Sequence, residues 1–232
     1  MDPAPAAGDG AHPDTWVVIP LFNEAAVIGD VVRGVRQELA HVVCVDDGST
    51  DGSGELARAA GAKVVRHPVN LGQGAALQTG IEYALSRPGA RYVVTFDADG
   101  QHQVTDALDM LARAREEDLA AVFGSRFLSE RVEAGLVRRI VLKLAVWFTR
   151  QSTGMRLTDA HNGLRVIRAD AARRIRLRQD GMAHASEIVL HIGRTGLPWA
   201  EHPVHVLYTD YSRGKGQSSL NSVNILVDLV FR

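Results

Sequence analysis

Between Thr15 and Phe123 the sequence alternates short apolar runs with longer amphipathic segments, and this alternation limits the possible fold more than any other feature. The apolar runs have the length of buried strands and cover residues 15–20, 41–45, 62–66, 91–96 and 120–123. The segments between them have helical spacing and cover residues 24–39, 51–60, 71–86 and 104–117. Such alternation indicates parallel strands joined by helical crossovers. We therefore expect an α/β fold with a doubly wound, mainly parallel sheet and helices on both faces.

Past Gly124 the alternation stops. We expect strands at residues 163–167 and around 202–208, a short helix after Asp170 and another helix near residues 186–195. Residues 1–14 are rich in Pro, Ala, Gly and Asp and lack the basic start and apolar run of a signal peptide, so a flexible tail is expected there. With 46% apolar and 23% charged residues, we expect residues 15–232 to form one globular domain.

Charge is distributed unevenly along the chain, although the formal net charge is only −1. Residues 1–125 hold 9 Lys/Arg against 18 Asp/Glu, whereas residues 126–178 hold 13 against 4. A basic block of this kind indicates an anionic partner, which can be a phosphate, a nucleic acid or an anionic membrane surface. The single cysteine, Cys44, excludes an intramolecular disulfide and a multi-cysteine metal site and favours a reducing compartment.

Residues 135–150 form the most apolar part of the basic block. Arginines and a lysine interrupt the segment, and no window reaches the roughly 18 uncharged apolar residues that a spanning helix needs. Its apolar residues share one helical face, with most of the cations outside that face, which is the pattern of a helix lying in a membrane interface. A helix that packs against the core of the domain has the same pattern.

Carboxylates follow three of the predicted strands, at the edge where open parallel sheets bind ligands. The first strand leads into Pro20-Leu21-Phe22-Asn23-Glu24, the second into Asp46-Asp47 and the fourth into Asp97-Ala98-Asp99-Gly100-Gln101. Two hard carboxylates separated by one residue suit Mg²⁺ or Mn²⁺, whose other positions take water and phosphate oxygens. Asp97 and Asp99 are therefore predicted metal ligands, with Gln101 able to add an oxygen.

Two nucleotide-binding motifs are missing from the sequence. No GxGxxG follows the first strand, and no GxxxxGK[ST] is present anywhere. The glycine-rich run at residues 70–75 precedes a helix and is compatible with two interpretations: backbone amides that approach a phosphate, or only a tight helix cap.

Several stretches resemble the motifs of the family 2 glycosyltransferases, which have the glycosyltransferase A-type fold. These stretches are VVIPLFNEAAVI, VCVDDGSTDGS, HPVNLGQGAALQTGI, TFDADGQH and FGSRF. Within that family, DADGQH, TDAHNGLRVIR and YSRGKGQS resemble the dolichyl-phosphate mannose synthase-like branch of polyprenyl-phosphate sugar transferases. The resemblance covers roughly residues 15–225. It implies an inverting, metal-dependent transfer of sugar from a UDP- or GDP-linked donor to a polyprenyl or dolichyl phosphate.

The resemblance also assigns a role to each matching residue. Residues 15–125 would form a nucleotide-binding half and residues 126–232 an acceptor half. The residues that would line the nucleotide pocket are Pro20, Phe22, Glu24 and Ala98, with Asp46 or Asp47 on the base. Asp97 and Asp99, assisted by Gln101, would bridge the diphosphate through Mg²⁺ or Mn²⁺, with Asp99 catalytic. The phosphate-binding cations would be Arg126, Arg131, Arg213 and Lys215.

The acceptor determines whether a general base is needed. A phosphate monoester has a second pKa near ~6 and is already ionised at neutral pH, so it needs a cationic cradle and no base. A sugar hydroxyl would need a carboxylate base, for which Asp159 is the candidate. A third reading is a nucleotide-sugar-binding membrane adaptor without catalysis. We expect a cytoplasmic protein, peripheral on the inner face of the membrane, with a membrane-embedded partner or self-association possible and no nucleic-acid partner.

Overall fold

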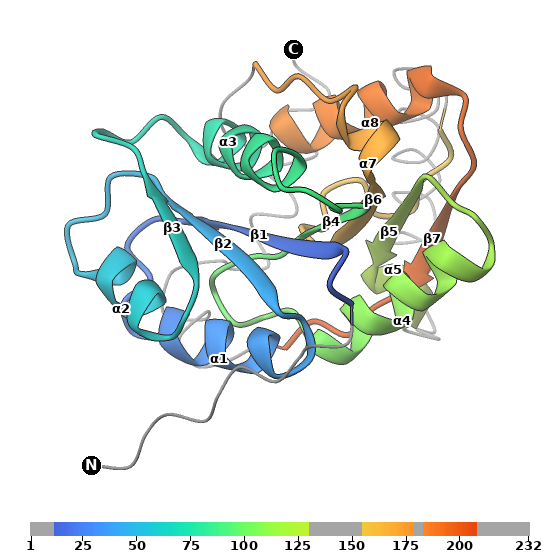
Figure 1. Cartoon of the computed structure of the whole chain (residues 1–232). Coiled ribbons are helices and arrows are strands. Elements are labelled where there is room, and N and C mark those ends of the chain that lie inside the picture. The colour runs from blue at the N-terminus through green and yellow to red at the C-terminus, as the bar shows by residue number, and fades with distance from the viewer. Residues whose placement is uncertain (1–11, 130–154, 179–182, 208–232) are drawn as a thin grey trace, which may run out of the picture.

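The computed structural model describes residues 12–129, 155–178 and 183–207 (Figure 1). Within them lies a seven-stranded sheet with the order β3-β2-β1-β4-β6-β5-β7. The strands are β1 Thr15–Leu21, β2 His41–Asp46, β3 Lys63–Arg66, β4 Tyr92–Thr95, β5 Ala121–Ser125, β6 Arg165–Arg168 and β7 Trp199–Pro203. The helices are α1 Ile28–Glu38, α2 Ser53–Ala59, α3 Gln73–Leu85, α4 Val104–Glu116, α5 Arg126–Ser129, α7 Ala169–Ala172 and α8 Ala183–Thr195.

All strands but β6 run in the same direction, which confirms the predicted mainly parallel α/β sheet. β1 pairs in parallel with β2 and β4, β2 with β3, and β5 with β7. β6 is antiparallel to both of its neighbours, so that Arg165 stands opposite Thr95 of β4 and Phe123 of β5. The sequence did not predict this insertion between β4 and β5. Because of it, the two proposed halves of the chain share one sheet.

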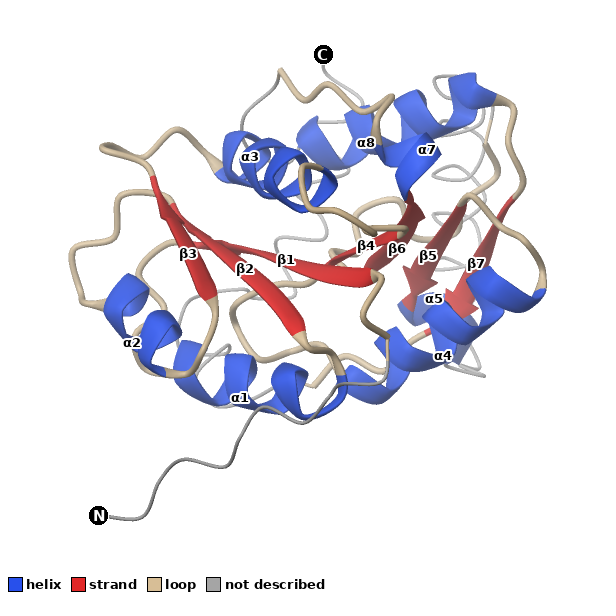
Figure 2. Ribbon diagram, in the orientation of Figure 1, coloured by secondary structure: helices blue, strands red, loops and turns tan. Residues whose placement is uncertain are grey.

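Helices cover both faces of the sheet, as Figure 2 shows. Successive side chains of a strand point to opposite faces, and β1 illustrates the consequence. Val17 and Ile19 join the core formed with α1, α2 and α4, whereas Trp16 and Val18 join the core formed with α3, α7 and α8. Burial of each such side chain contributes roughly 1.5–3 kcal/mol, so both layers stabilise the sheet edge that carries the site.

One predicted boundary is wrong. The last strand was expected around residues 202–208 but covers Trp199–Pro203, because β7 pairs with β5 in a register that places Trp199 opposite Ala121. Arg115 of α4 contacts both His12 and Asp14, so these two residues lie against α4.

Several predictions fall on residues outside the described part of the chain. They are the interfacial helix at residues 135–150 and the phosphate-binding residues Arg131, Arg213 and Lys215. Among the helices that are described, none has the length and apolar character required to cross a bilayer.

Candidate active site

The loops that follow β1 and β2 are tied together at the carboxyl edge of the sheet. Ser49 Oγ accepts a hydrogen bond from Asn23 N at 3.0 Å, and Ser53 Oγ accepts one from Glu24 N at 2.8 Å. These contacts hold Phe22, whose side chain is exposed, and Glu24 at the rim of the sheet. Pro20 lies further back, buried within β1, because β1 extends to Leu21.

Asp47 is buried and fastens the glycine-rich loop before α3. Its Oδ1 accepts a hydrogen bond from Leu71 N at 2.9 Å, and its Oδ2 accepts one from Gly72 N at 2.8 Å. Oδ1 also lies 2.7 Å from His67 Nδ1, and the other ring nitrogen of His67 lies 3.0 Å from Thr79 Oγ1 in α3. Both oxygens of Asp47 are therefore engaged in holding the fold.

Asp46 is equally buried but less engaged. Its Oδ1 accepts a hydrogen bond from Ser49 N at 2.9 Å. Its Oδ2 packs against Gly54, lies 3.6 Å from Arg66 Nε and has no hydrogen-bond partner among the described residues. Of the two carboxylates predicted to contact a base, only Asp46 thus keeps an oxygen without a hydrogen bond.

Asp97 and Asp99 follow β4 and differ from the Asp46–Asp47 pair. Asp97 Oδ2 lies 2.9 Å from His102 Nε2, while its Oδ1 has only a long contact of 3.4 Å with Gln73 Nε2. Asp99 Oδ1 accepts a hydrogen bond from Gln101 N at 3.0 Å. The sequence between them contributes Ala98, which is buried. Each carboxylate therefore keeps coordinating capacity at the surface of the site.

The pKa values of Asp97 and Asp99 are shifted in opposite directions. Burial raises the pKa of Asp97, but the charges of His102 and Arg165 outweigh burial and bring this pKa below its ordinary value. Burial, the charge of Asp97 and the charge of Glu24 together raise the pKa of Asp99, against the hydrogen bond from the Gln101 amide. Two ionised carboxylates close to each other repel, and a divalent cation between them would remove that repulsion.

The residues present fit a hard divalent cation that also binds a phosphate ligand. The donor set is carboxylate oxygen, which Mg²⁺ and Mn²⁺ prefer. Within the described ranges, no group of three or more His, Cys, Asp or Glu side chains is arranged to hold a metal ion by itself. Asp97 and Asp99 would therefore need water and substrate oxygens to complete a coordination shell, as Mg²⁺ sites with phosphates usually do.

The turn that leads into β6 packs directly on Asp97. Thr95 Oγ1 donates a hydrogen bond to Gly163 O at 2.6 Å, and the backbone of Gly163 touches the Asp97 carboxylate. Arg165, two residues later, is fully buried, and toward the described residues it donates only a long hydrogen bond, 3.4 Å, to Ala160 O. Burial lowers the pKa of Arg165 to about 10, while the nearby carboxylates of Asp97 and Asp159 favour its charged form. Arg165 is thus a buried cation at neutral pH.

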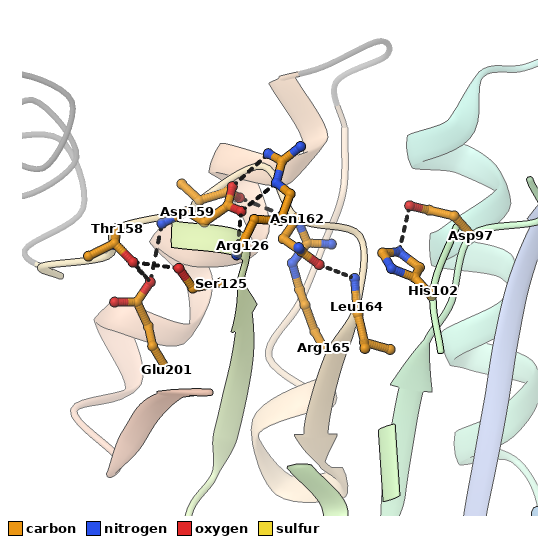
Figure 3. Close-up of polar contacts among 11 residues, drawn as sticks. Asp97, His102, Ser125, Arg126, Thr158, Asp159, Asn162, Leu164, Arg165 and Glu201 are labelled. Carbon is orange, nitrogen blue, oxygen red and sulfur yellow. Dashed lines mark hydrogen bonds and ion pairs between the residues drawn. The ribbon is translucent and has the colours of Figure 1, made fainter. Parts of the chain in front are cut away.

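Arg126, directly after β5, forms a two-pronged ion pair with Asp159 (Figure 3). Its Nε lies 2.7 Å from Asp159 Oδ2, and its terminal nitrogen lies 2.9 Å from Oδ1. The turn that carries Asp159 is held in turn by Glu201 Oε1, which accepts hydrogen bonds from the amides of Thr158 and Asp159. The side chain of Arg126 is 39% exposed while that of Asp159 is buried, so the arginine is fixed at the surface of the site.

Two residues of the site, Gly163 and Glu201, were not predicted from the sequence. Arg165 is a residue that the sequence marks as able to order its loop or to touch the acceptor, and its burial was not predicted. A charged residue inside an apolar strand was the available signal for Arg165, because such residues are rarely buried without a partner. No local pattern distinguishes Gly163 or Glu201, since their partners lie 66 and about 40 residues away in the sequence.

Comparison with known proteins shows which family the chain belongs to. The sequence profile described as Glycosyl transferase family 2 matches residues 16–176, more than half of the chain. The chain belongs to glycosyl transferase family 2. This glycosyltransferase is also 34% identical to an uncharacterised protein of Methanocaldococcus jannaschii, with 94% of this chain and 92% of that protein covered.

Two relatives of this glycosyltransferase have names that state an acceptor. One is the UDP-N-acetylglucosamine–dolichyl-phosphate N-acetylglucosaminyltransferase of Methanococcus voltae, 27% identical over 93% of this chain and 94% of the relative. The other is the undecaprenyl-phosphate mannosyltransferase of Micrococcus luteus, 29% identical over 88% and 86% of the two chains. The resemblance to polyprenyl-phosphate sugar transferases is thereby confirmed.

Solved structures confirm the fold of this family 2 glycosyltransferase. Mannosyl-3-phosphoglycerate synthase from Rubrobacter xylanophilus superimposes with a TM-score of 0.64 at 17% identity, covering 92% of this chain and 72% of that chain. Glucosyl-3-phosphoglycerate synthase from Mycobacterium tuberculosis, in complex with Mn²⁺, UDP-glucose and phosphoglyceric acid, gives 0.59 at 19% identity, covering 93% and 79%. At these identities the likeness concerns the fold alone.

Proposed function

We propose that this glycosyltransferase transfers a sugar, with inversion, from a UDP- or GDP-linked donor to a polyprenyl phosphate at the inner face of the membrane. Mg²⁺ or Mn²⁺ would be held by Asp97 and Asp99, with Gln101 nearby, and would stabilise the charge that develops on the departing diphosphate. The two lipid-phosphate relatives and the structural neighbour with Mn²⁺ and UDP-glucose support this assignment.

The single observation that carries the proposal is the pairing of Arg126 with Asp159, which lies on the same turn as Gly163, the residue that contacts the Asp97 carboxylate. The pair presents a fixed guanidinium, and a guanidinium binds phosphate oxygens through two parallel hydrogen bonds. A cation is what an ionised acceptor needs, because two unit charges 4 Å apart repel by about 4 kcal/mol at an effective dielectric near 20. Arg126 is therefore assigned to the acceptor phosphate.

A sugar hydroxyl as acceptor is the less favoured reading. It would require Asp159 as the general base, but both oxygens of Asp159 contact Arg126 and the side chain is buried. A base must reach the proton that it removes, and this carboxylate faces an arginine instead. Asp159 is better explained as the residue that orients Arg126.

The donor pocket is proposed to lie along the rim of β1, β2 and β4. Phe22 is exposed there, and Glu24 lies close enough to Asp99 to affect its pKa. For the base contact we assign Asp46 rather than Asp47, because only Asp46 has an oxygen without a hydrogen bond among the described residues. Arg131, Arg213 and Lys215 remain proposed phosphate ligands.

The test is a screen of UDP- and GDP-sugars against a short polyprenyl phosphate with Mg²⁺ or Mn²⁺, in which the lipid product is identified by mass. We expect a product with one sugar per lipid phosphate, and no product when the metal is removed with EDTA. A protein that binds UDP or GDP but never forms product would instead support the non-catalytic adaptor. Transfer to a sugar hydroxyl under the same conditions would support Asp159 as a base.

A further inference from the structure

We propose that Gly163 is a positioning residue, whose missing side chain seats the carboxylate of Asp97. A Cβ atom built on Gly163 would lie 2.5 Å from both Cγ and Oδ1 of Asp97, and closer still to Oδ2. All three of the nearest atoms belong to this one carboxylate. This inference rests on the proposed function, in which Asp97 is a metal ligand.

The backbone of Gly163 does not by itself require glycine. Its φ lies outside the left-handed region, unlike that of Gly48, Gly72 or Gly100. Any residue can adopt such a conformation, so conformational freedom gives no reason for glycine at this position. The contact with Asp97 is therefore the feature that excludes a side chain.

The turn around Gly163 is held on several sides and cannot easily retreat. Thr95 Oγ1 donates to Gly163 O at 2.6 Å, and Asn162 Oδ1 accepts from Leu164 N at 2.9 Å. Gly124 N of β5 donates to Leu164 O at 3.0 Å. An added methyl group would therefore displace the Asp97 carboxylate rather than the turn.

The displaced carboxylate would lose its set position between two neighbours. His102 Nε2 lies 2.9 Å from Asp97 Oδ2, so the carboxylate is held between this imidazole and Gly163 (Figure 3 shows the His102 contact). The same turn carries Asp159, which orients Arg126. Through Gly163 and Asp159, one turn thus fixes the positions of the Asp97 carboxylate, the proposed metal ligand, and of Arg126, the cation assigned to the acceptor phosphate.

The experiment compares Gly163→Ala with Gly34→Ala as a matched control. Gly34 lies in α1, and a Cβ there meets nothing within 4 Å. For each purified full-length protein, Mn²⁺ binding is measured in the presence of UDP or of GDP, and the unfolding temperature is recorded. We expect Gly163→Ala to weaken Mn²⁺ binding by about 10–100-fold, the range found when groups that orient metal ligands are changed. Gly34→Ala should leave it unchanged.

A second readout needs no metal. The ¹⁵N signals of the His102 imidazole, assigned with a His102→Gln variant, should shift in Gly163→Ala and stay in place in Gly34→Ala. If they do not shift, or if Gly163→Ala binds Mn²⁺ as tightly as the native protein, the inference is overturned. If the native protein binds neither Mn²⁺ nor nucleotide, the proposed function fails, while the imidazole signals still decide whether Gly163 seats Asp97.

Discussion

Two pairs of aspartates, Asp46–Asp47 after β2 and Asp97–Asp99 after β4, lie on either side of β1 at the same edge of the sheet. Their surroundings differ, and so do their roles. Asp46 and Asp47 are buried, and backbone amides occupy three of their four oxygens. Asp97 and Asp99 are less buried, and between them receive one backbone amide, one histidine and a long contact from the Gln73 amide. The first pair mainly builds the loops and leaves one oxygen of Asp46 without a hydrogen bond among the described residues, whereas the second pair keeps the capacity to bind a metal and repels itself. The donors that surround a carboxylate, more than its place after a strand, decide whether it is structural or chemical.

Removal of Asp99 should have the largest effect on activity. We expect Asp99→Ala to lower sugar transfer by about 10²–10³-fold, because it removes a proposed ligand of the metal that would stabilise the negative charge developing on the diphosphate. Metal-dependent binding of UDP or GDP should be lost as well. The unfolding temperature should not fall, since the variant loses a carboxylate repelled by Asp97 and Glu24. The control is Asp109→Ala on the exposed face of α4. Full transfer by Asp99→Ala would contradict the metal site.

Removal of Asp47 should instead affect folding. Asp47→Ala removes the buried acceptor that the Leu71 amide, the Gly72 amide and His67 Nδ1 share, and we expect the free energy of unfolding to fall by about 3 kcal/mol. Urea denaturation at pH 7 measures this loss. Asp30→Ala, whose side chain is 83% exposed, should change the stability by less than about 0.5 kcal/mol. Equal stability of the two variants would mean that Asp47 does not hold the loop.

Neutralising Asp159 should weaken binding of the acceptor and leave binding of the donor nucleotide unchanged. Asp159→Asn keeps the shape of the side chain but turns an acceptor toward Arg126 into a donor, so the guanidinium loses its fixed position. We expect the KM for polyprenyl phosphate to rise by about tenfold or more, with metal-dependent nucleotide binding within about twofold of native. A fall in kcat with unchanged KM would point to Asp159 acting as a base.

A third rim carboxylate, Asp51, should give the smallest effect. Burial raises its pKa, but hydrogen bonds from the Ser53 hydroxyl and from the amides of Ala25 and Ser53 outweigh burial and lower it. A pKa lowered by folding stabilises the protein above the unfolded value and loses that contribution as the pH falls. We expect Asp51→Asn to be less stable than native by no more than about 0.5–1 kcal/mol at pH 7, since Asp51 is largely exposed.

The pH profile tests this sign. The stability difference between native protein and Asp51→Asn should shrink as the pH falls through the lowered pKa of folded Asp51 and vanish once its carboxyl is protonated in both the folded and the unfolded protein. A difference that grows toward low pH would show that the pKa of Asp51 is raised in the folded protein. Urea denaturation at several pH values provides the measurement.

Local pattern was enough to predict the first five strands and the edge where the carboxylates gather. An apolar run such as residues 91–96 becomes a buried strand whichever strands lie beside it. Asp97 and Asp99 come directly after this run, so they lie at the end of that strand. The same reasoning failed for the last strand. An edge strand such as β7 takes its bounds from its partner, and the partner of Trp199 is 78 residues earlier in the sequence.

The sequence by itself determined the alternating α/β architecture, the family and the acidic rim, because periodicity and short motifs are local properties of the chain. Only the tertiary structure decided that β6 lies antiparallel between β4 and β5. That insertion brings Gly163 and Arg165 to Asp97 and sets Asp159 against Arg126. The physical reason is that strand order depends on packing across the whole sheet, and the environment that makes one aspartate structural and another reactive is assembled from residues far apart in the sequence.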